Sequence, residues 1–219
     1  MISSRASTLH NKESETTGKG YERARAILEA TRTIFANDGY AGLSMRAVAS
    51  KVGVNLSTVQ HYYPSKDILI EALLSQTLQD YQAAVDLYVP SGSQANSLDQ
   101  HQFEALIDHF LDDLSTPESS GMLSELWALA YRHAFAADIL DQMLTRSRKV
   151  FRNLIRNRMP ELAPEQCELR GALMVAQLQG LTLYLATSRP QHKELAGLKT
   201  AARAAIVHLA VAPEINPKK

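Results

Sequence analysis

The chain has 219 residues, of which 45% are hydrophobic and 21% charged, and its 23 Lys/Arg balance its 23 Asp/Glu. Such a composition is typical of a globular protein with a sizeable core, and it excludes a disordered or collagen-like chain. The single cysteine, Cys167, excludes an internal disulfide framework and indicates a reducing cytoplasm. We expect neither a signal peptide nor a membrane-spanning helix, because no apolar stretch precedes Gly20 and no run of 18 apolar residues occurs.

The neutral total hides an uneven distribution of charge. Residues 1–70 contain nine Lys/Arg and six Asp/Glu, a net charge of +3, whereas residues 71–219 have a net charge of −3. Positive charge attracts phosphates over about 8–10 Å, the Debye length at physiological salt. The N-terminal part is therefore the better candidate for contact with nucleic acid.

Residues 1–20 are rich in Ser, Thr and Gly and lack an apolar period, which predicts a disordered N-terminal arm. Its cations fit either a solvated tail or an arm that contacts DNA, and the sequence leaves both open. In Tyr21–Asp38, apolar residues recur at three- and four-residue spacing, so we expect a helix that ends at Gly39.

The next stretch, SMRAVASKVGVNLSTVQHYYPSK, predicts two short helices joined by a tight turn. Ser44 can cap the first helix, Met45–Val52, and Gly53 can end it in the left-handed conformation. Asn55 can cap the second helix, Leu56–Tyr63. Small polar residues at the start of that helix leave room for approach to base edges in a major groove. An ordinary helical hairpin with a polar outer face is the alternative.

This stretch resembles the DNA-binding part of the TetR (tetracycline-repressor) family of transcriptional regulators, whose pattern here is close to G-V-S-x-x-T-[LIV]-Y-x-[HY]-F-x-[SN]-K. The resemblance covers roughly residues 22–75. The matching positions are Gly53, Val54, Thr58, Val59, Tyr62, Pro64, Ser65 and Lys66. Gln60 departs from the pattern, because it stands where the family commonly has Tyr and can bond adenine bidentately. Base preference is thus a point on which this chain can differ from the family.

The resemblance implies an all-α fold with a helix-turn-helix domain in residues 21–66 and a helical ligand-binding and dimerisation domain in residues 67–212. A tail over residues 213–219 follows. The residues that it places at the DNA are Ser44, Arg46, Asn55, Leu56, Ser57, Thr58, Gln60, His61, Tyr62 and Lys66. Arg46 is suited to guanine, and the Thr, Tyr and Lys side chains of this set are suited to phosphates.

Helical periodicity continues through the rest of the chain, with no strand pattern and no internal repeat. A long helix from Lys66 to about Tyr88 would connect the two domains, and a loop to about Asn96 would follow it. The helices expected beyond the loop are His101–Leu114, Met122–Phe135, Ile139–Met159, Pro164–Thr187 and Lys193–Val211.

The segments ELWALAYR and QLQGLTLYLA resemble the C-terminal domain of the choline-responsive and related TetR branches. By that resemblance, a small-molecule effector pocket would be lined by Phe103, Phe110, Met122, Trp127, Tyr131, Met174, Gln177 and Tyr184. Aromatic rings there could hold a quaternary ammonium group by cation–π contact. Rings at helical spacing are equally what an ordinary helical core contains, so both interpretations stay open.

The last two helices carry small and apolar residues, which predict a face that packs against a second copy of the chain. The family pairs these helices with those of the two-fold mate in a four-helix bundle. The expected interface residues are Leu173, Gly180, Leu181, Ala201, Ala205 and His208. Two recognition helices would then lie about 34–36 Å apart and require a near-palindromic, double-stranded operator.

Other charged groupings carry weaker signals. His109 and Asp113 have the spacing of a helical metal site, but no HExxH motif or cysteine cluster accompanies them, so we expect no metal. No catalytic or cofactor-binding motif occurs, so we expect neither an enzyme nor a cofactor. Arg148, Arg152 and Arg156 form a basic stripe, which fits a solvated face paired with acids or an entrance for an anionic effector.

The sequence as a whole predicts a cytoplasmic, homodimeric transcriptional regulator, a repressor that a small-molecule effector releases from a palindromic operator. The alternative is a helical small-molecule carrier or enzyme in which the helix-turn-helix is incidental.

Overall fold

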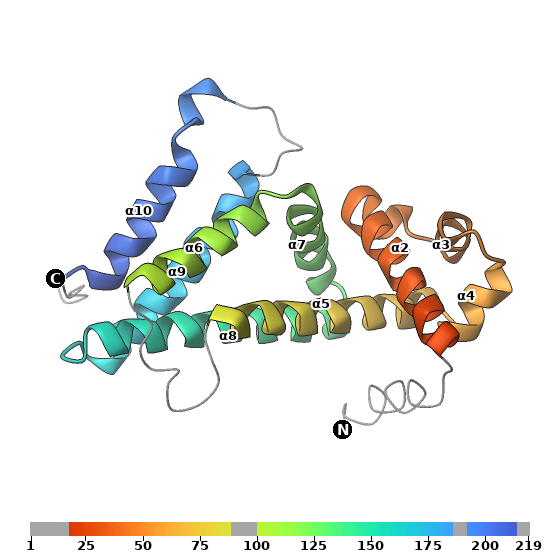
Figure 1. Cartoon of the computed structure of the whole chain (residues 1–219), viewed down its shortest axis with the longest axis horizontal. Coiled ribbons are helices and arrows are strands. Elements are labelled where there is room, and N and C mark those ends of the chain that lie inside the picture. The colour runs from red at the N-terminus through yellow and green to blue at the C-terminus, as the bar shows by residue number, and fades with distance from the viewer. Residues whose placement is uncertain (1–17, 89–99, 186–191, 214–219) are drawn as a thin grey trace. The chain divides into compact units, whose positions relative to one another are not determined.

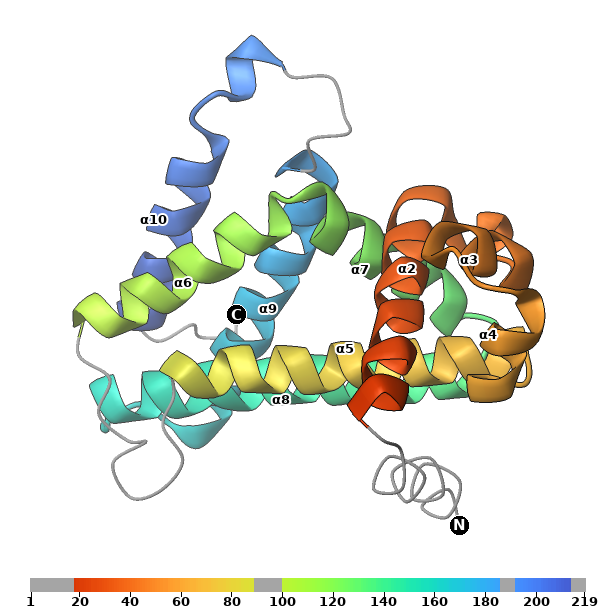
Figure 2. The ribbon, with the colours of Figure 1, turned by 45° about the vertical axis from the view of Figure 1, so that its right-hand side comes forward.

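The computed structural model describes residues 18–88, 100–185 and 192–213, and every regular element in these ranges is helical (Figures 1 and 2). The all-α prediction is thereby confirmed. The chain divides into two compact units, residues 1–73 and 74–219, and the division falls inside helix α5 (Lys66–Tyr88). The sequence placed a domain boundary seven residues earlier, between residues 66 and 67.

The predicted N-terminal arm and C-terminal tail lie mostly outside the described residues. Gly18–Gly20, assigned to the arm, already belong to the first described helix. Of the predicted tail, only Pro213 is described.

Unit 1 contains α2 (Gly18–Gly42), α3 (Met45–Val52), α4 (Leu56–Tyr62) and the first turns of α5. Apolar side chains from all four helices form its core: Ile27, Ile34, Phe35, Leu43, Val48, Val59 and Leu69. Gly39 interrupts α2 with φ 70° and ψ −178°, a backbone conformation that side chains with a Cβ rarely adopt. The regular helix therefore stops where the sequence predicted.

Unit 2 contains the rest of α5 and all later helices. Their bounds are α6 (Gln100–Leu114), α7 (Pro117–Ala130), α8 (Ala134–Arg158), α9 (Pro164–Leu185), the short 3-10 helix η1 (Lys193–Leu195) and α10 (Leu198–Val211). One apolar cluster joins α5, α6, α7, α8, α9 and α10. A Cβ on Gly171 of α9 would lie 2.9 Å from the Arg148 carbonyl oxygen of α8, so glycine permits a close approach of these two helices.

The structure corrects two predicted helices in the middle of the chain. We expected Met122–Phe135 and Ile139–Met159, whereas α7 begins at Pro117 and α8 at Ala134. The hydroxyl of Thr116 accepts a hydrogen bond from Ser119 N (3.2 Å), and Pro117 at the first helical position needs no N–H partner. A Ser-Thr-Pro sequence that we interpreted as ending α6 therefore also starts α7.

The last predicted helix, Lys193–Val211, is divided at Gly197 into η1 and α10. At the far end of α10, the guanidinium of Arg170 from α9 donates to the carbonyl oxygens of Leu209 (3.4 Å) and Pro213 (2.8 Å). The Arg170 side chain is fully buried. Carbonyl groups at a helix C-terminus carry partial negative charge, so this cation occupies a favourable position there.

Candidate nucleic-acid interface

Local hydrogen bonds shape the α3–α4 turn. Ser44 caps α3, because its Oγ accepts a hydrogen bond from Ala47 N at 3.1 Å. Gly53 ends the helix with φ 73° and ψ 37°, the left-handed conformation, and donates to Ser50 O at 3.2 Å. The bounds of α3, its cap and its glycine agree with the sequence-based prediction.

The start of α4 differs in one respect. Asn55 occupies the N-cap position with an extended backbone, but its side chain makes no capping hydrogen bond. The predicted Asn55 side-chain cap was therefore wrong. The helix also ends at Tyr62, one residue earlier than expected, and Tyr63 follows it in an extended conformation.

Two residues anchor α4 to the core of unit 1. Val59 is fully buried and Tyr63 is 7% exposed, and the Tyr63 hydroxyl donates to Ala24 O of α2 at 3.5 Å. With these side chains turned inward, the opposite side of α4 faces outward.

That outward side is polar. Of the predicted DNA contacts, six side chains are exposed: Ser44, Arg46, Asn55, Ser57, Gln60 and His61. The other four are half-buried: Leu56, Thr58, Tyr62 and Lys66. The His61 and Tyr62 rings lie edge to face with their centroids 5.2 Å apart. Arg46, Ser57, Gln60 and His61 can therefore reach a partner without disturbing the core.

Lys66 at the start of α5 is already engaged within unit 1. Its Nζ donates to Tyr40 O at 2.6 Å and lies 3.7 Å from the centroid of the Tyr40 ring. Burial lowers the pKa of Lys66, and the nearby Asp67 carboxylate acts in the opposite direction. The Tyr40 hydroxyl donates to Asp67 Oδ1 at 3.4 Å.

Sequence reasoning missed Tyr40 and Asp67 as partners of Lys66. Tyr40 lies 26 positions earlier than Lys66, so no helical spacing connects them. A residue predicted as a phosphate contact thus also joins the end of α2 to the start of α5.

The eight residues predicted for the effector pocket do not share one environment. Four lie in or against the core cluster of unit 2: Phe103, Phe110, Trp127 and Met174. Met122 on α7 is also buried. Tyr131, in the turn after α7, is 92% exposed, Tyr184 is 63% exposed, and Gln177 is exposed as well. In the single chain, the last three lie at the surface.

A polar pair that the sequence did not suggest lies beside these rings. The hydroxyl groups of Tyr81 on α5 and Ser147 on α8 share a hydrogen bond. The Tyr81 ring lies 6.2 Å from that of Phe110, which is 6.0 Å from that of Phe151. Burial raises the pKa of the Tyr81 phenol, so the hydroxyl stays protonated at neutral pH.

Five of the six residues predicted for the dimer interface are exposed on α9 and α10: Leu173, Gly180, Ala201, Ala205 and His208. Leu181 is the exception, because it is buried and lies in the same core stripe as Met174 and Leu178. Its assignment to the outer face was wrong. Leu169, Leu183 and Val211 extend the exposed apolar surface of these helices.

The basic stripe on α8 is largely paired with an acid. Arg152 Nη1 lies 2.7 Å and Arg148 Nη1 3.7 Å from the carboxylate of Glu168 on α9. The hydrogen bond from Arg152 lowers the pKa of Glu168 despite partial desolvation. These contacts support the solvated, paired face rather than an anion entrance.

A family model described as bacterial regulatory proteins of the tetR family matches residues 27–73, which include α3 and α4. Residues 27–73 therefore have the DNA-binding helix-turn-helix of the TetR family of bacterial regulatory proteins. Within the described ranges of the chain, no helix has the length and apolar character needed to cross a membrane.

Two curated relatives illustrate the similarity. An uncharacterized HTH-type transcriptional regulator encoded in the dhlA 5′ region of Xanthobacter autotrophicus is 30% identical over 123 residues, 55% of this chain and 59% of that relative. The HTH-type transcriptional repressor KstR of Mycobacterium tuberculosis is 35% identical over 72 residues, 33% of each chain. The chain therefore matches 59% and 33% of the lengths of these two regulators.

Similarity to solved structures extends over both units. A Saccharomonospora viridis protein solved in complex with choline has a TM-score of 0.71 and 16% identity, covering 90% of this chain and 99% of that one. At this level of identity, the likeness shows a shared fold.

Proposed function

We propose that this protein is a homodimeric repressor of the TetR family that binds a palindromic operator through α3 and α4. A small-molecule effector bound among the helices of unit 2 would release it. The observation that carries the proposal is the exposed polar side of α4, held outward by the buried Val59 and Tyr63. The carrier or enzyme alternative has no observation in its favour, since the relatives are named transcriptional regulators.

DNA recognition by this surface would divide between bases and backbone. Arg46 and Gln60 are exposed and have side chains suited to guanine and adenine edges in the major groove. Ser57 and His61 lie on the same exposed side and would reach a base or a phosphate. The net charge of +3 over residues 1–70 favours association with the phosphates of DNA. We place this binding in the cytoplasm.

A homodimer is supported by the uncovered apolar face of α9 and α10. Leu173 is 45% and Leu183 49% exposed, and alanines continue this surface along α10. Contiguous exposed apolar surface commonly marks a protein interface. A two-fold dimer would present two α4 helices to successive major grooves about 34–36 Å apart.

The effector proposal rests on the aromatic cluster of unit 2 and on the choline complex among the structural neighbours. Phe110 and Trp127 pack against the core, where a cationic ligand could lie against their rings. A ligand that favours one of two conformations with a coupling free energy of about 1–3 kcal/mol would change operator affinity about 5- to 150-fold.

A mobility-shift titration with DNA from upstream of the protein's own gene, at several salt concentrations, tests the DNA-binding proposal. We expect sequence preference to persist as salt rises, while total affinity falls. Binding without preference at every salt concentration would contradict a sequence-specific regulator.

Gln60→Ala gives a narrower test. We expect lost discrimination at one base pair and a nearly unchanged salt dependence, because a neutral base contact releases no counterions. Gln142→Ala, which removes an exposed amide from α8, is the matched control. Uniform weakening on all sequences would instead assign Gln60 to the phosphate backbone.

A further inference from the structure

Helix α10 packs on the rest of unit 2 through an apolar stripe, in which Leu198, Ala202, Val207 and Leu209 are partly buried against the core. Among its residues, Ile206 and Ala210 are the buried ones. Ala201, Ala205 and His208 face outward. Apolar contacts are not directional, so polar contacts help to fix the rotation of such a helix and its position along its own axis. Arg170 supplies one polar contact at the C-terminal end of α10, and a further contact lies along the length of the helix.

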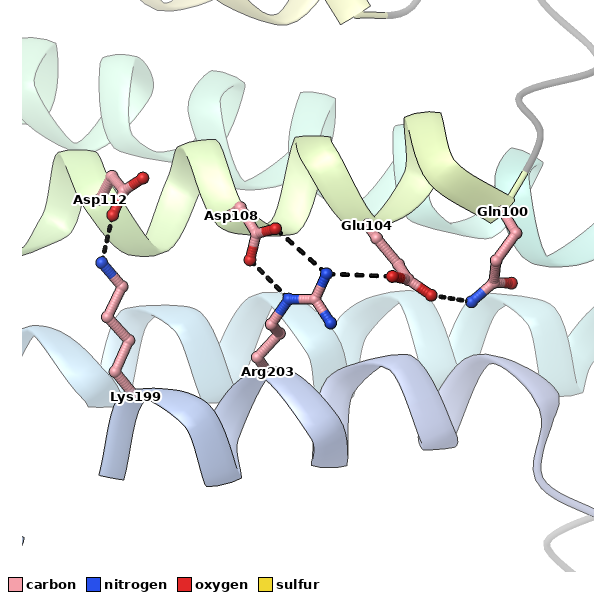
Figure 3. Close-up of polar contacts among 6 residues, drawn as sticks. All are labelled: Gln100, Glu104, Asp108, Asp112, Lys199 and Arg203. Carbon is pink, nitrogen blue, oxygen red and sulfur yellow. Dashed lines mark hydrogen bonds and ion pairs between the residues drawn. The ribbon is translucent and has the colours of Figure 1, made fainter. Parts of the chain in front are cut away.

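Charged residues between α6 and α10 supply that contact. We call them the α6–α10 ion-pair cluster: Glu104, Asp108, Asp112, Lys199 and Arg203 (Figure 3). Arg203 Nε donates to Asp108 Oδ1 at 2.6 Å, and its Nη2 lies 3.0 Å from Glu104 Oε2 and 3.1 Å from Asp108 Oδ2. Lys199 pairs with Asp112, and Gln100 donates to Glu104.

The spacing of these charges favours the observed alignment of the two helices, in which all three carboxylates have a cation. The three carboxylates follow one another at four-residue intervals on α6, and the two cations do so in the opposite direction on α10. A slide by one turn, about 5.4 Å, would leave at least one carboxylate without the cation that it has here. The forked guanidinium of Arg203 adds directionality, because it contacts two carboxylates at once.

The outer faces of α9 and α10 contrast with the α6–α10 ion-pair cluster in charge. Apart from His208, their exposed residues are uncharged between Ala172 and Tyr184 and between Ala201 and Val211. An interface made of these faces alone would not weaken as salt rises, because excluded salts leave apolar burial intact or strengthen it. The ion-pair cluster is partly exposed, so salt does screen it.

We propose that Arg203 and Lys199 are positioning residues for self-association. By fixing α10 on α6, they hold Ala201, Ala205 and His208 in the arrangement that a second copy of this chain binds. The inference rests on the homodimer proposed above and adds that ionic strength regulates its formation. Dimer affinity falls with ionic strength although the interface itself is nearly free of charge.

Sedimentation velocity on the full chain over a range of concentrations and NaCl tests this inference. For the wild type, the dimer dissociation constant rises with NaCl. Arg203→Met keeps the apolar stem and removes the cation, so the low-salt dissociation constant rises about fivefold and its salt dependence becomes smaller. Lys193→Met removes an exposed cation from η1 and is the matched control, with wild-type behaviour expected.

A charge exchange at the Lys199–Asp112 pair separates positioning from general stability. Lys199→Glu and Asp112→Lys each weaken the dimer, and the two together restore it, because the attraction is re-formed with its charges reversed. Urea unfolding of the monomer, measured at low protein concentration, shows whether a variant has changed the fold itself.

The outcomes distinguish this inference from the dimer proposal. A wild-type chain that is monomeric at every concentration contradicts the homodimer. A wild-type dimer whose affinity is unchanged by Arg203→Met and by both single Lys199 and Asp112 substitutions overturns the positioning role and leaves the dimer intact. If Arg203→Met fails to fold, the Lys199–Asp112 exchange decides.

Discussion

The α3–α4 turn of unit 1 and helix α10 of unit 2 depend on contacts of very different separation along the sequence. In the α3–α4 turn of unit 1, the defining hydrogen bonds join near neighbours, such as Ser44 with Ala47 and Gly53 with Ser50. In unit 2, α10 is held by Arg203 with Glu104, which lie 99 positions apart. The first arrangement is encoded by a short motif, whereas the second exists only after most of the unit has folded.

The substitution with the largest expected effect on stability tests whether unit 1 unfolds independently of unit 2. Phe35→Ala removes a fully buried ring, and we expect unit 1 to lose about 3–5 kcal/mol of unfolding free energy. Hydrogen exchange should show lost amide protection in α3 and α4, with protection kept in α8 and α9. Equal loss in both units would show that they unfold together and would remove the contrast between them.

The same substitution at two glycines should act with opposite sign in the two units. Gly53→Ala places a Cβ on a residue with φ +73°, so we expect a loss of about 1–2 kcal/mol although nothing lies within 4 Å of the new carbon. Gly180→Ala lies within helix α9 with equally open space, so we expect a gain of about 0.5–1 kcal/mol. Urea unfolding at concentrations that keep the chain monomeric measures both. A stabilised Gly53→Ala would contradict the left-handed turn.

A smaller effect separates the two caps of the recognition motif. Ser44→Ala removes a capping acceptor and should cost about 1 kcal/mol of stability. Asn55 makes no capping hydrogen bond, so Asn55→Ala should change stability by only a few tenths of a kcal/mol, like an ordinary surface substitution. Thermal unfolding of both variants supplies the comparison. Equal losses would mean that Asn55 caps α4 in solution.

The smallest effect concerns the pH dependence of unit 2. Hydrogen bonds from Gln100 and then Arg203 lower the pKa of Glu104 below its unfolded value. The ionised carboxylate therefore stabilises the folded chain above the unfolded pKa, and this stabilisation is lost as the pH falls through the folded pKa. We expect the urea midpoint of the wild type to fall more steeply on acidification than that of Glu104→Gln. Glu161→Gln, at an exposed carboxylate, should follow the wild type.

The parts that the sequence predicted well are those with local causes. The bounds of α3, its serine cap and its left-handed glycine depend on residues within a few positions of one another. The polar side of α4 followed from the positions of Val59 and Tyr63, which the structure buries. The direct roles of Arg46, Gln60 and their neighbours at DNA stay predictions.

The features of the structure that the sequence predicted poorly depend on which face of a helix contacts a residue far away in the sequence. Leu181 and Tyr184 lie three residues apart on α9, yet Leu181 is buried and Tyr184 is 63% exposed. Both are apolar enough to suit either place, so hydropathy alone does not separate them. The prediction of where α7 begins was wrong for another reason. Thr116-Pro117 suits the end of one helix as well as the beginning of the next.

The buried guanidinium of Arg170 bears on the order in which this protein is completed during synthesis. Its acceptors, the carbonyl groups of Leu209 and Pro213, are among the last described residues to leave the ribosome. Until they emerge, the charge on α9 must remain hydrated, because a buried cation without acceptors is costly. The region around Arg170 thus reaches its native packing only after residue 213 has left the ribosome.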